Sequence, residues 1–396
     1  MRVAIIGQGY VGLTIALSAA SAGHTVIGFD VNDGLVAQLN VGKSHIEGIS
    51  DTSLSGFLSN GSYRASTDAS SLDGCDVIVI AVPTPLDDAR NPDLSFVHAA
   101  SELINRNVKS PGLIVNESTS YPGTLRTEIA ARITTVEHLY ASSPERVDPG
   151  NTQWGTKNTP RLIGGLTPAA VARAREFYAT FCDSIIEVSS PEVAEAAKIF
   201  ENTFRQVNIA LVNEFAQISD ALGISSREVI EAAATKPYGF MPFTPGPGVG
   251  GHCIPVDPSY LAHVANQVGI PATFIKRANE VNLAMPAYVV KRVVAGAGGS
   301  IKGKEVVVVG VSYKANVADT REAPAAAVID LLREQGATVV WHDDLVSSWR
   351  TESSSPITGA DIAVIVTMHD GVDVAAIKAC GYVFDCTGQL AGVDGI

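Results

Sequence analysis

The first thirty residues restrict the fold of this chain more than any other stretch. A short apolar run at residues 2–6 is followed by three glycines in a GxGxxG pattern, and an alanine-rich helical segment then extends to about Ala22. A second apolar run, residues 24–29, ends at Asp30. A GxGxxG motif that joins a strand to a helix, with a second strand and an acidic residue after it, indicates a dinucleotide site. We therefore predict that the chain begins with a Rossmann domain.

Each glycine of that motif has its own physical role. Gly7 makes the tight turn, Gly9 lets the backbone approach a pyrophosphate, and Gly12 allows the helix to pack closely on the strand. The N–H groups at the helix N-terminus then face the phosphates. The Asp30 carboxylate accepts hydrogen bonds from the adenosine ribose and repels a 2′-phosphate, which predicts NAD rather than NADP. The predicted cofactor contacts of this region are Gly7, Gly9, Tyr10, Val11, Gly12 and Asp30.

Further apolar runs end in polar loops. Residues 77–82 and 113–116 are predicted strands of a doubly wound parallel sheet. The first run ends at Pro83-Thr84-Pro85, which places Thr84 in a loop at the carboxyl end of a strand, where such sheets bind ligands. The same argument applies to the polar stretches 117–124 and 142–150, although each also fits an ordinary solvated connection.

A long helix is predicted at residues 191–222, because residues 192–222 contain neither glycine nor proline and their apolar positions follow helical spacing. Such a helix is about 45 Å long at 1.5 Å per residue, longer than one domain needs, so we expect it to link domains and to form a dimer interface. Lys198 and Asn202 lie four residues apart and share a face of this helix. On spacing alone, a solvated polar pair is the preferred interpretation of these two residues.

The stretch 245–258 contains four glycines and four prolines in fourteen residues, so it forms neither a helix nor a paired strand. It presents Cys253 near its centre, where glycines allow a substrate to approach the backbone. A catalytic thiol is one interpretation. The alternative is a buried cysteine that acts as a small apolar side chain, since a reactive thiol needs an exposed, electropositive site.

A second alternating region begins after the glycine-rich linker at residues 296–303. Its predicted strands lie near residues 306–309, 337–341, 362–366 and 382–384, without a GxGxxG motif. Lys314 and Arg321 follow its first strand, at a position where basic side chains can bind phosphates. The expected fold is α/β, with two Rossmann-like doubly wound parallel-sheet domains (residues 1–190 and 297–396) joined by a central all-helical domain with one long helix (191–296).

Composition limits the partners and the compartment. The 41 acidic and 28 basic residues give a net charge of -13, which argues against binding to nucleic acid or to an anionic membrane. Five scattered cysteines without a CxxC pair predict neither a disulfide framework nor a metal site, and they favour the cytoplasm. The uncharged run at residues 3–23 has some features of a signal peptide, but the glycine turn explains it better, and no membrane span is expected.

Six separated motifs resemble those of the UDP-glucose/GDP-mannose dehydrogenase family. They are GxGYVGL at the start, Asn116-Glu117-Ser118-Thr119, Ser143-Pro144-Glu145-Arg146, Lys198 with Asn202, Gly250-Gly251-His252-Cys253 and Asp319-Thr320-Arg321-Glu322. The resemblance covers nearly the whole chain in the right order. Within the family, residues 239–253 and 143–151 are most similar to bacterial UDP-N-acetylglucosamine 6-dehydrogenases, while UDP-N-acetylmannosamine dehydrogenases share the Pro-Gly-Pro-Gly motif.

The resemblance implies a four-electron oxidation of the C6 hydroxyl of a UDP-sugar to a carboxylate, with two NAD molecules used in succession at one site. The expected substrate is a UDP-N-acetylhexosamine, with UDP-N-acetylglucosamine first and UDP-N-acetylmannosamine or UDP-glucose as alternatives, for surface polysaccharide precursor synthesis. Cys253 would capture the aldehyde as a thiohemiacetal, and oxidation would then give a thioester that water hydrolyses. A covalent intermediate divides one hard step into two easier ones.

The family's catalytic roles carry over to residues of this chain. Lys198 and Asn202 would stabilise the oxyanion at C6. Asp257 would position water or assist proton transfer, and Glu145 with Thr119 would activate the hydrolytic water.

The resemblance also implies ligand contacts. NAD contacts are added at Thr84, Thr119 and Arg321, and the implied contacts of the UDP-sugar are Glu145, Lys198, Asn202, Gly250 and Lys314. Where UDP-glucose dehydrogenases use an arginine from the neighbouring subunit, this chain has Lys236 nearby, which lacks the planar fork of a guanidinium. We hypothesise that Lys236 belongs to a pocket rebuilt for an N-acetyl group. No role is predicted for His252.

Two other classes of function remain open from the sequence. A two-electron alcohol or hydroxyacid dehydrogenase also combines a Rossmann domain with a helical domain, but it needs no thiol in the loop and yields one NADH per substrate. A non-catalytic sugar-nucleotide or NAD sensor is expected to lack the combination of Cys253, Lys198, Asn202 and Glu145, all four of which are present.

Overall fold

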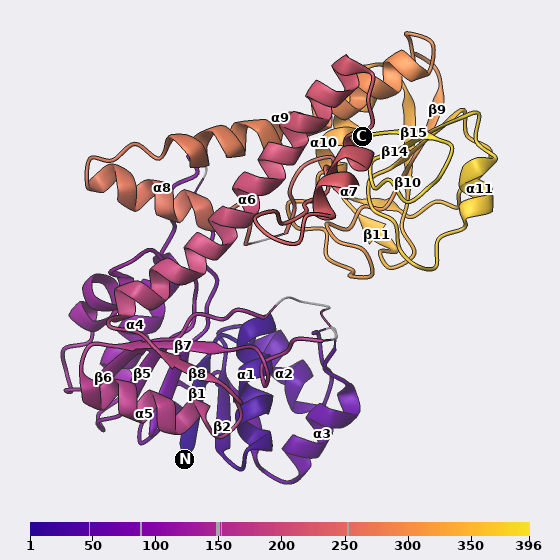
Figure 1. The fold of residues 1–396 in the computed structure, drawn as a ribbon. Coiled ribbons are helices and arrows are strands. Elements are labelled where there is room, and N and C mark those ends of the chain that lie inside the picture. Colours follow the sequence, from indigo (N-terminus) through magenta and orange to yellow (C-terminus); the bar gives the residue numbers. More distant parts are fainter. Residues whose placement is uncertain (47, 88, 148–150, 152, 252) are drawn as a thin grey trace. The chain divides into compact units, whose positions relative to one another are not determined.

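The computed structural model describes residues 1–46, 48–87, 89–147, 151, 153–251 and 253–396. The chain divides into two compact units (Figure 1). The first comprises Met1–Glu201 with Ser259–Gly269, and the second comprises Asn202–Pro258 with Ile270–Ile396. Each unit contains its own sheet, as the sequence predicts for two α/β domains.

The sheet of the first unit has eight strands in the order β3-β2-β1-β4-β5-β6-β7-β8. Neighbouring strands are parallel from β3 to β6, whereas β7 runs antiparallel to β6 and β8 is parallel to β7. The bounds are β1 (Arg2–Ile6), β2 (Thr25–Phe29), β3 (Tyr63–Ser66), β4 (Val77–Ile80), β5 (Leu113–Asn116), β6 (Leu139–Ser142), β7 (Arg161–Gly165) and β8 (Ile185–Glu187). The strands predicted from the sequence are confirmed as β1, β2, β4 and β5, and the reversed pair β7 and β8 was not predicted.

Helices cover this sheet because its strands are apolar on both sides. Val3, Val79 and Val115 pack in one cluster with the buried sides of α1 and α5, and Ile78 and Ile80, which point to the other face, are also fully buried. The sites open to a ligand are therefore at the strand ends. The helices and short turns are α1 (Tyr10–Ser21), α2 (Asp33–Asn40), α3 (Asp51–Ser59), η1 (Ala69–Leu72), α4 (Ser95–Asn107), η2 (Leu125–Ile129), η3 (Ala130–Arg132) and α5 (Pro168–Tyr178).

The predicted long helix is confirmed as α6 (Pro191–Leu222), with 32 residues. Its first part, to Glu201, belongs to the first unit and the remainder to the second. The other helices of this region are α7 (Ser226–Ala234), α8 (Asp257–Gln267) and α9 (Thr273–Gly296), and α9 contains the buried Pro286. Among the helices of the described residues, none combines the length and apolar character needed to cross a membrane.

The second unit has a smaller parallel sheet in the order β10-β9-β13-β14-β15. Buried residues of α9 and α10 pack on one face of it, and a second buried cluster that includes Ile377 of α11 lies on the other. The strands and helices are β9 (Glu305–Val309), α10 (Ala325–Glu334), β10 (Thr338–His342), β13 (Ile362–Ile365), α11 (Val374–Lys378), β14 (Tyr382–Asp385) and β15 (Asp394–Gly395), with a separate hairpin of β11 (Ser348–Trp349) and β12 (Glu352–Ser353). The predicted second Rossmann-like domain is confirmed.

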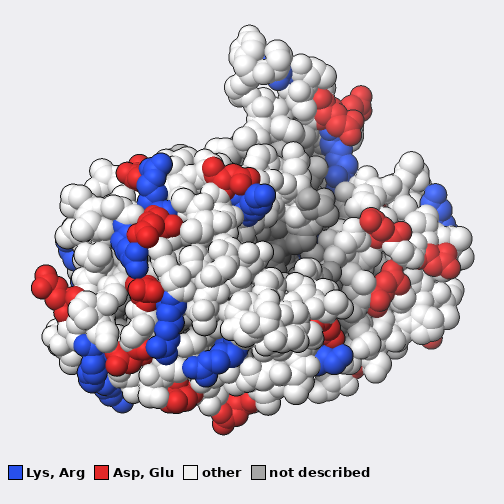
Figure 2. Space-filling model, turned by 90° about the horizontal axis from the view of Figure 1, so that it is seen from below, with Lys and Arg blue, Asp and Glu red and all other residues white. Residues whose placement is uncertain are grey.

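The face drawn in Figure 2 carries charges of both signs. Figure 2 shows Lys and Arg side chains interspersed with Asp and Glu, and the face drawn carries no extended basic patch. Together with the net charge of -13, this distribution gives a polyanion little to bind on that face.

Candidate functional site

In the turn after β1, two positions must be glycine because of the packing around them. Gly7 has a positive φ of 90°, and a Cβ there would lie 2.4 Å from the carbonyl oxygen of Ala81. A Cβ on Gly12 would lie 1.8 Å from the carbonyl oxygen of Gly7. Both glycines therefore allow the turn and the first turn of α1 to pack together, which accounts for two of the three glycines in the motif.

Gly9 differs from the other two glycines. Its φ of -69° suits any residue, and a Cβ at this position would meet nothing within 4 Å. Gly9 is the N-cap of α1 and provides no side chain to cap the helix. An open approach to backbone N–H groups at a helix N-terminus is what a pyrophosphate requires, so these residues fit a dinucleotide.

We predict that Gly9→Ser weakens NAD binding at least about tenfold without loss of stability, because its hydroxymethyl group would occupy the pyrophosphate position and serine is a favourable N-cap. Gly12→Ala is the contrasting variant, because its Cβ would overlap the Gly7 carbonyl and lower the melting temperature. Calorimetric titration with NAD and thermal unfolding separate the two effects. Wild-type NAD affinity in Gly9→Ser would show that the space beside Gly9 is not the pyrophosphate site.

Asp30 follows β2 and holds the glycine turn. Its Oδ2 accepts the N–H of Gln8 at 2.8 Å, and its Oδ1 accepts the N–H of Asn32 at 3.0 Å. Each carboxylate oxygen has further lone-pair capacity, so a ribose hydroxyl can still be bound. The fully buried Gln8 side chain donates to the Ile5 carbonyl and accepts from the Tyr63 hydroxyl at 2.8 Å. Sequence reasoning missed Gln8, because an x position of the motif carries no signal.

The loops that follow β4 and β5 are linked at the carboxyl edge of the sheet. Thr84 lies in the loop after β4, as predicted, and its side chain is buried. Thr119 is half-buried in the loop after β5. Between them, Ser118 Oγ accepts the N–H of Val82 at 2.9 Å and donates to the carbonyl of the same residue at 2.8 Å. These bonds hold Thr84 and Thr119 on two adjoining loops of one edge.

Glu145 lies in the loop that follows β6, in a site rich in donors. Its Oε1 accepts the backbone N–H groups of Arg146 at 2.7 Å and Val147 at 2.8 Å. Its Oε2 lies 2.6 Å from Nη2 of Arg161. Burial opposes ionisation of Glu145, but Arg161, the two N–H groups and Lys198 outweigh it and lower the pKa of this carboxyl. The carboxylate is therefore ionised and oriented near neutral pH.

Arg161 is the central cation of this cluster, and sequence reasoning missed it. It is the first residue of β7, its side chain is 4% exposed, and its Nη1 lies 3.1 Å from Oε1 of Glu117. Its guanidinium also lies 4.5 Å from the ring centroid of Tyr178, whose hydroxyl donates to Glu117 at 2.5 Å. One arginine thus holds two carboxylates. The sequence does not show whether an arginine at the start of a strand is buried or exposed.

The two carboxylates on Arg161 have opposite pKa shifts. Burial raises the pKa of Glu117 to about 7, against the opposing effect of Arg161, and the charge of Glu145 adds to the rise. Oε2 of Glu117 is buried and has no hydrogen-bond partner among the described residues, whereas Glu145 accepts two backbone N–H groups. This difference in hydrogen bonding explains why Glu145 ionises more readily than Glu117.

Glu195 fixes the start of α6 to the loop after β5. Its carboxylate accepts the N–H groups of Gly123 at 2.7 Å and Leu125 at 2.9 Å. Burial raises the pKa of Glu195 to about 8, with the two backbone hydrogen bonds acting in the opposite direction. Because Lys198 lies one turn further along α6, this contact fixes the position of Lys198 relative to the loop that carries Thr119. Sequence analysis did not predict a role for Glu195.

Cys253 of the second unit is exposed, whereas Cys75, Cys182, Cys380 and Cys386 are all buried. Its carbonyl oxygen accepts the N–H of Asp257 at 2.8 Å, at the start of α8. The interpretation of Cys253 as a buried apolar residue is therefore wrong. An accessible thiol in a glycine-rich loop meets the first requirement for chemistry.

Asn202 and Asp257 lie together in the same unit. Nδ2 of Asn202, on α6, donates to Oδ2 of the buried Asp257 at 2.5 Å. The carboxylate thereby orients the amide, and both groups belong to the set that the sequence analysis assigned to catalysis. Lys198, on the part of α6 that belongs to the first unit, instead interacts with Glu145.

The loop that carries Cys253 packs against the segment that follows β9. The N–H of Gly251 donates to the Arg321 carbonyl at 3.0 Å, and a Cβ on Gly250 would lie 2.6 Å from Cβ of Tyr313. At the other end of the loop, the N–H of Gly246 donates to Oδ1 of Asn213 at 2.9 Å. The glycine at position 250 is thus required by the close approach of the Tyr313 side chain.

The remaining predicted residues are placed as follows. Lys314 is half-buried in the loop after β9, and Arg321 in the same loop forms an ion pair with Asp319. Lys236 is exposed after α7, with its ammonium 5.0 Å from the ring centroid of Tyr238. His252 and residues 148–150 of the polar loop after β6 lie outside the described residues.

The first unit has a dinucleotide turn at a helix N-terminus and polar side chains at the same sheet edge, and the second unit has an exposed thiol. These features fit the class of nicotinamide-dependent oxidoreductases. Three family models match the chain in sequence. They are the NAD binding domain, central domain and UDP binding domain of the UDP-glucose/GDP-mannose dehydrogenase family, at residues 1–182, 192–284 and 307–391. The chain belongs to this family, and the protein is an NAD-dependent UDP-sugar dehydrogenase.

Similar proteins cover most of the chain. A UDP-N-acetyl-D-mannosamine dehydrogenase of Methanococcus maripaludis is 37% identical over 380 residues, 93% of this chain and 86% of its own length. A UDP-N-acetyl-D-glucosamine 6-dehydrogenase of Pseudomonas aeruginosa is 34% identical over 359 residues, 88% of this chain and 84% of its own. The solved structure of a UDP-D-ManNAc dehydrogenase from Pyrococcus horikoshii has a TM-score of 0.90 at 31% identity and covers 100% of this chain and 99% of its own.

Proposed function

We propose that the protein oxidises the C6 hydroxyl of a UDP-N-acetylhexosamine to the carboxylate in two NAD-dependent steps, through a covalent intermediate on Cys253. The observation that carries this proposal is the exposure of Cys253 in a glycine-rich loop, while the other four cysteines are buried. A two-electron dehydrogenase has no use for that thiol. The product would be a uronic acid suited to surface polysaccharide synthesis.

The bound NAD supplies the hydride acceptor for each oxidation. In the first step the hydride of a C6–H bond would leave to that acceptor and the proton of the C6 hydroxyl would pass to a water molecule positioned by Asp257, while Lys198 and the Asn202 amide stabilise the negative charge on the oxygen. The Cys253 thiolate then adds to the aldehyde carbon and forms a C–S bond. A second loss of hydride from C6 leaves the thioester.

Hydrolysis of the thioester assigns a task to Glu145. Its ionised carboxylate takes a proton from the attacking water, and Thr119 holds that water, as the C–S bond breaks and returns the thiolate of Cys253. Asp257, which already orients the Asn202 amide, assists proton transfer near the thiol. The lowered pKa of Glu145 keeps this carboxyl in the ionised form that can accept a proton.

The relatives support an N-acetylhexosamine as the sugar, since the names of two of them specify N-acetyl-D-mannosamine and N-acetyl-D-glucosamine. These sugars are epimers at the carbon that carries the acetamido group. UDP-N-acetylglucosamine, the substrate expected from the sequence motifs, and its manno epimer are therefore the two candidates. Lys236 remains our candidate for a pocket adapted to the acetamido group, and Lys236→Ala should raise KM for the UDP-sugar.

The substrate assignment is tested with purified protein, NAD and one of three UDP-sugars, with NADH absorbance as the readout. We expect kcat/KM for UDP-N-acetylmannosamine or UDP-N-acetylglucosamine to exceed that for UDP-glucose at least about tenfold, the effect of one well-placed hydrogen bond in a binding site. The highest kcat/KM with UDP-glucose would contradict the N-acetylhexosamine assignment.

We also propose that the chain consists of three domains, at residues 1–190, 191–296 and 297–396. The protein is further proposed to form a homodimer through α6. Support for the dimer comes from a stripe of exposed apolar side chains on one face of α6, at Phe204, Leu211, Ile218 and Leu222. Light scattering should give twice the chain mass, and a monomeric wild-type protein would contradict the proposal.

A further inference from the structure

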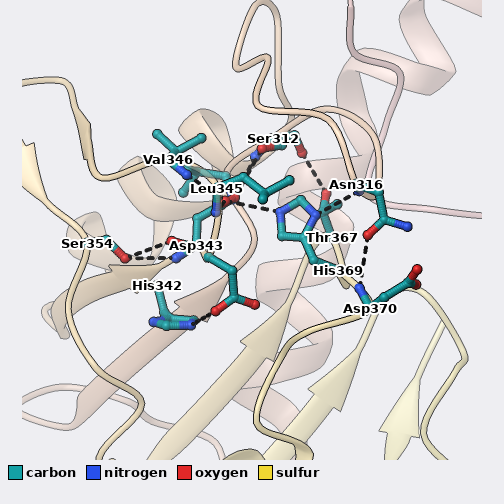
Figure 3. A network of polar contacts seen from close by, with 12 residues as sticks. Ser312, Asn316, His342, Asp343, Leu345, Val346, Ser354, Thr367, His369 and Asp370 are labelled. Carbon is teal, nitrogen blue, oxygen red and sulfur yellow. Dashed lines mark hydrogen bonds and ion pairs between the residues drawn. The ribbon is translucent and has the colours of Figure 1, made fainter. Parts of the chain in front are cut away.

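Buried polar side chains close the carboxyl edge of the sheet in the second unit, between β9, β10 and β13 (Figure 3). Asp343 follows β10 and His369 follows β13, and their side chains are 0% and 4% exposed. Nε2 of His369 lies 3.1 Å from Oδ1 of Asp343. A buried histidine in contact with a buried carboxylate at this edge needs a reason, because the edge is where a doubly wound sheet binds its ligand.

Asp343 corresponds in position to Asp30 of the first unit, since each follows the second strand of its sheet and accepts an N–H from the turn after the first strand. For Asp343, Oδ2 accepts the N–H groups of Val311 at 2.8 Å and Ser312 at 3.1 Å. The contacts of its Oδ1 are Leu345 N, Val346 N and His369. Unlike Asp30, Asp343 therefore has no capacity left for a ribose, and this edge is a structural support rather than a dinucleotide site.

His369 contacts both Asp343 and the loop after β9 that contains Asn316. Its Nδ1 accepts the N–H of Asn316 at 2.8 Å, so the ring proton of the neutral histidine is on Nε2, the atom nearest Asp343. Asn316 has a positive φ of 62°, and its Oδ1 accepts the N–H of Asp370 at 3.0 Å. Two hydrogen bonds thus hold Asn316 in a left-handed conformation that costs an L-residue energy.

Asn316 belongs to the segment of residues 312–322, which we name the Lys314 loop. The same segment contacts the Cys253 loop, through the Arg321 carbonyl on the Gly251 N–H and through Tyr313 beside Gly250. A continuous series of contacts therefore connects Asp343, through His369, to the backbone that supports the thiol.

We propose that His369, held by Asp343, is a positioning residue that sets the Lys314 loop for the diphosphate of a UDP-sugar. This inference rests on the proposed contact between Lys314 and the substrate phosphates. Displacement of Asn316 would move Lys314, two residues away, and would weaken binding of the nucleotide without altering the NAD turn in the first unit.

Two variants of His369 separate this role from simple packing. His369→Gln places an amide N–H near the former Nε2 and keeps the contact with Asp343, but it offers no acceptor to Asn316. His369→Asn places an oxygen near the former Nδ1 and keeps the acceptor for Asn316. We expect His369→Gln to weaken UDP binding about tenfold, the effect of one lost buried hydrogen bond, and to raise KM for the UDP-sugar with kcat and the KM for NAD within about twofold. His369→Asn should bind UDP more tightly than His369→Gln.

The exposed Asn316 gives a second pair of variants that does not disturb the core. Asn316→Ala should weaken UDP binding more than Asn316→Gly, because glycine adopts a positive φ without strain. UDP affinity is measured by calorimetry, with melting temperatures recorded for all four variants.

Wild-type UDP affinity in both His369→Gln and Asn316→Ala would overturn the proposal. Equal losses of affinity and melting temperature in the two histidine variants would also overturn it, because they would indicate a packing role alone. UDP binding requires no turnover, so an incorrect assignment of the sugar or of the oxidation would appear in activity assays and not in this titration.

Discussion

Cys253→Ser should lower the rate of uronic acid formation at least about 10³-fold, the order of effect seen when a catalytic nucleophile is removed. The serine hydroxyl is a much weaker nucleophile at neutral pH than a thiol, so the aldehyde would not be captured. The NAD binding domain, with the glycine turn that we expect to contact NAD, belongs to the other unit, so NAD affinity should stay within about twofold of the wild-type value.

The measurement combines NADH release, product analysis and calorimetric titration with NAD. As a control for access, iodoacetamide should alkylate Cys253 before the four buried cysteines, and peptide mass spectrometry identifies the site. Uronic acid formation by Cys253→Ser at the wild-type rate would exclude the covalent route.

Arg161→Met should lower the free energy of unfolding by about 3–5 kcal/mol, the usual cost of removing one partner from a buried ion pair. The substitution leaves the carboxylates of Glu117 and Glu145 without their shared guanidinium. Activity should fall as well, because Glu145 would lose the donor that orients it.

The loss of stability should be larger at pH 8 than at pH 5.5. The pKa of Glu117 in the folded protein is about 7, above its ordinary value of 4.5, so the folded state binds more protons than the unfolded state between these values. Stability from this group is present at low pH and falls as pH rises through that window. Without Arg161 the pKa of Glu117 should rise further and that of Glu145 should rise from its lowered value, so the window extends upward.

Urea unfolding at the two pH values tests this account. Arg161→Lys is the matched control, because it keeps the positive charge but loses the planar fork, and it should be less destabilised than Arg161→Met. Adding Glu117→Gln to Arg161→Met should recover part of the loss, since one unpaired carboxylate is removed. Destabilisation by Arg161→Met that is equal at both pH values would count against the coupling of these charges.

The fold was predictable where local pattern and packing agree. The glycine turn, β1, β2, β4 and β5 follow from apolar runs bounded by glycine or proline, and α6 follows from a long helical period without breakers. The predicted strands of the second domain are β9, β10, β13 and β14. The reversed β7 and β8 were not predictable, because strand direction depends on tertiary pairing rather than on local sequence.

The candidate site was predictable where a residue type is unusual for its surroundings, as with Cys253 among glycines. The supporting residues could not be found in this way. Arg161, Glu195 and His369 act through partners that lie 16, 72 and 53 residues away in sequence, and no local pattern marks such pairs. Sequence spacing placed Lys198 and Asn202 on one helix. Glu145 and Asp257 were also expected at the site, but their interactions with Lys198 and Asn202 emerged only from the structure.

The number of NADH molecules formed per UDP-sugar consumed tests the central claim most directly. A limiting amount of the best UDP-N-acetylhexosamine is converted to completion with excess NAD, NADH is measured by absorbance, and the carbon products are identified by mass spectrometry. The proposed oxidation predicts two NADH for each sugar nucleotide and a uronic acid as the product. One NADH per sugar, with an aldehyde or ketone as the product, would contradict it.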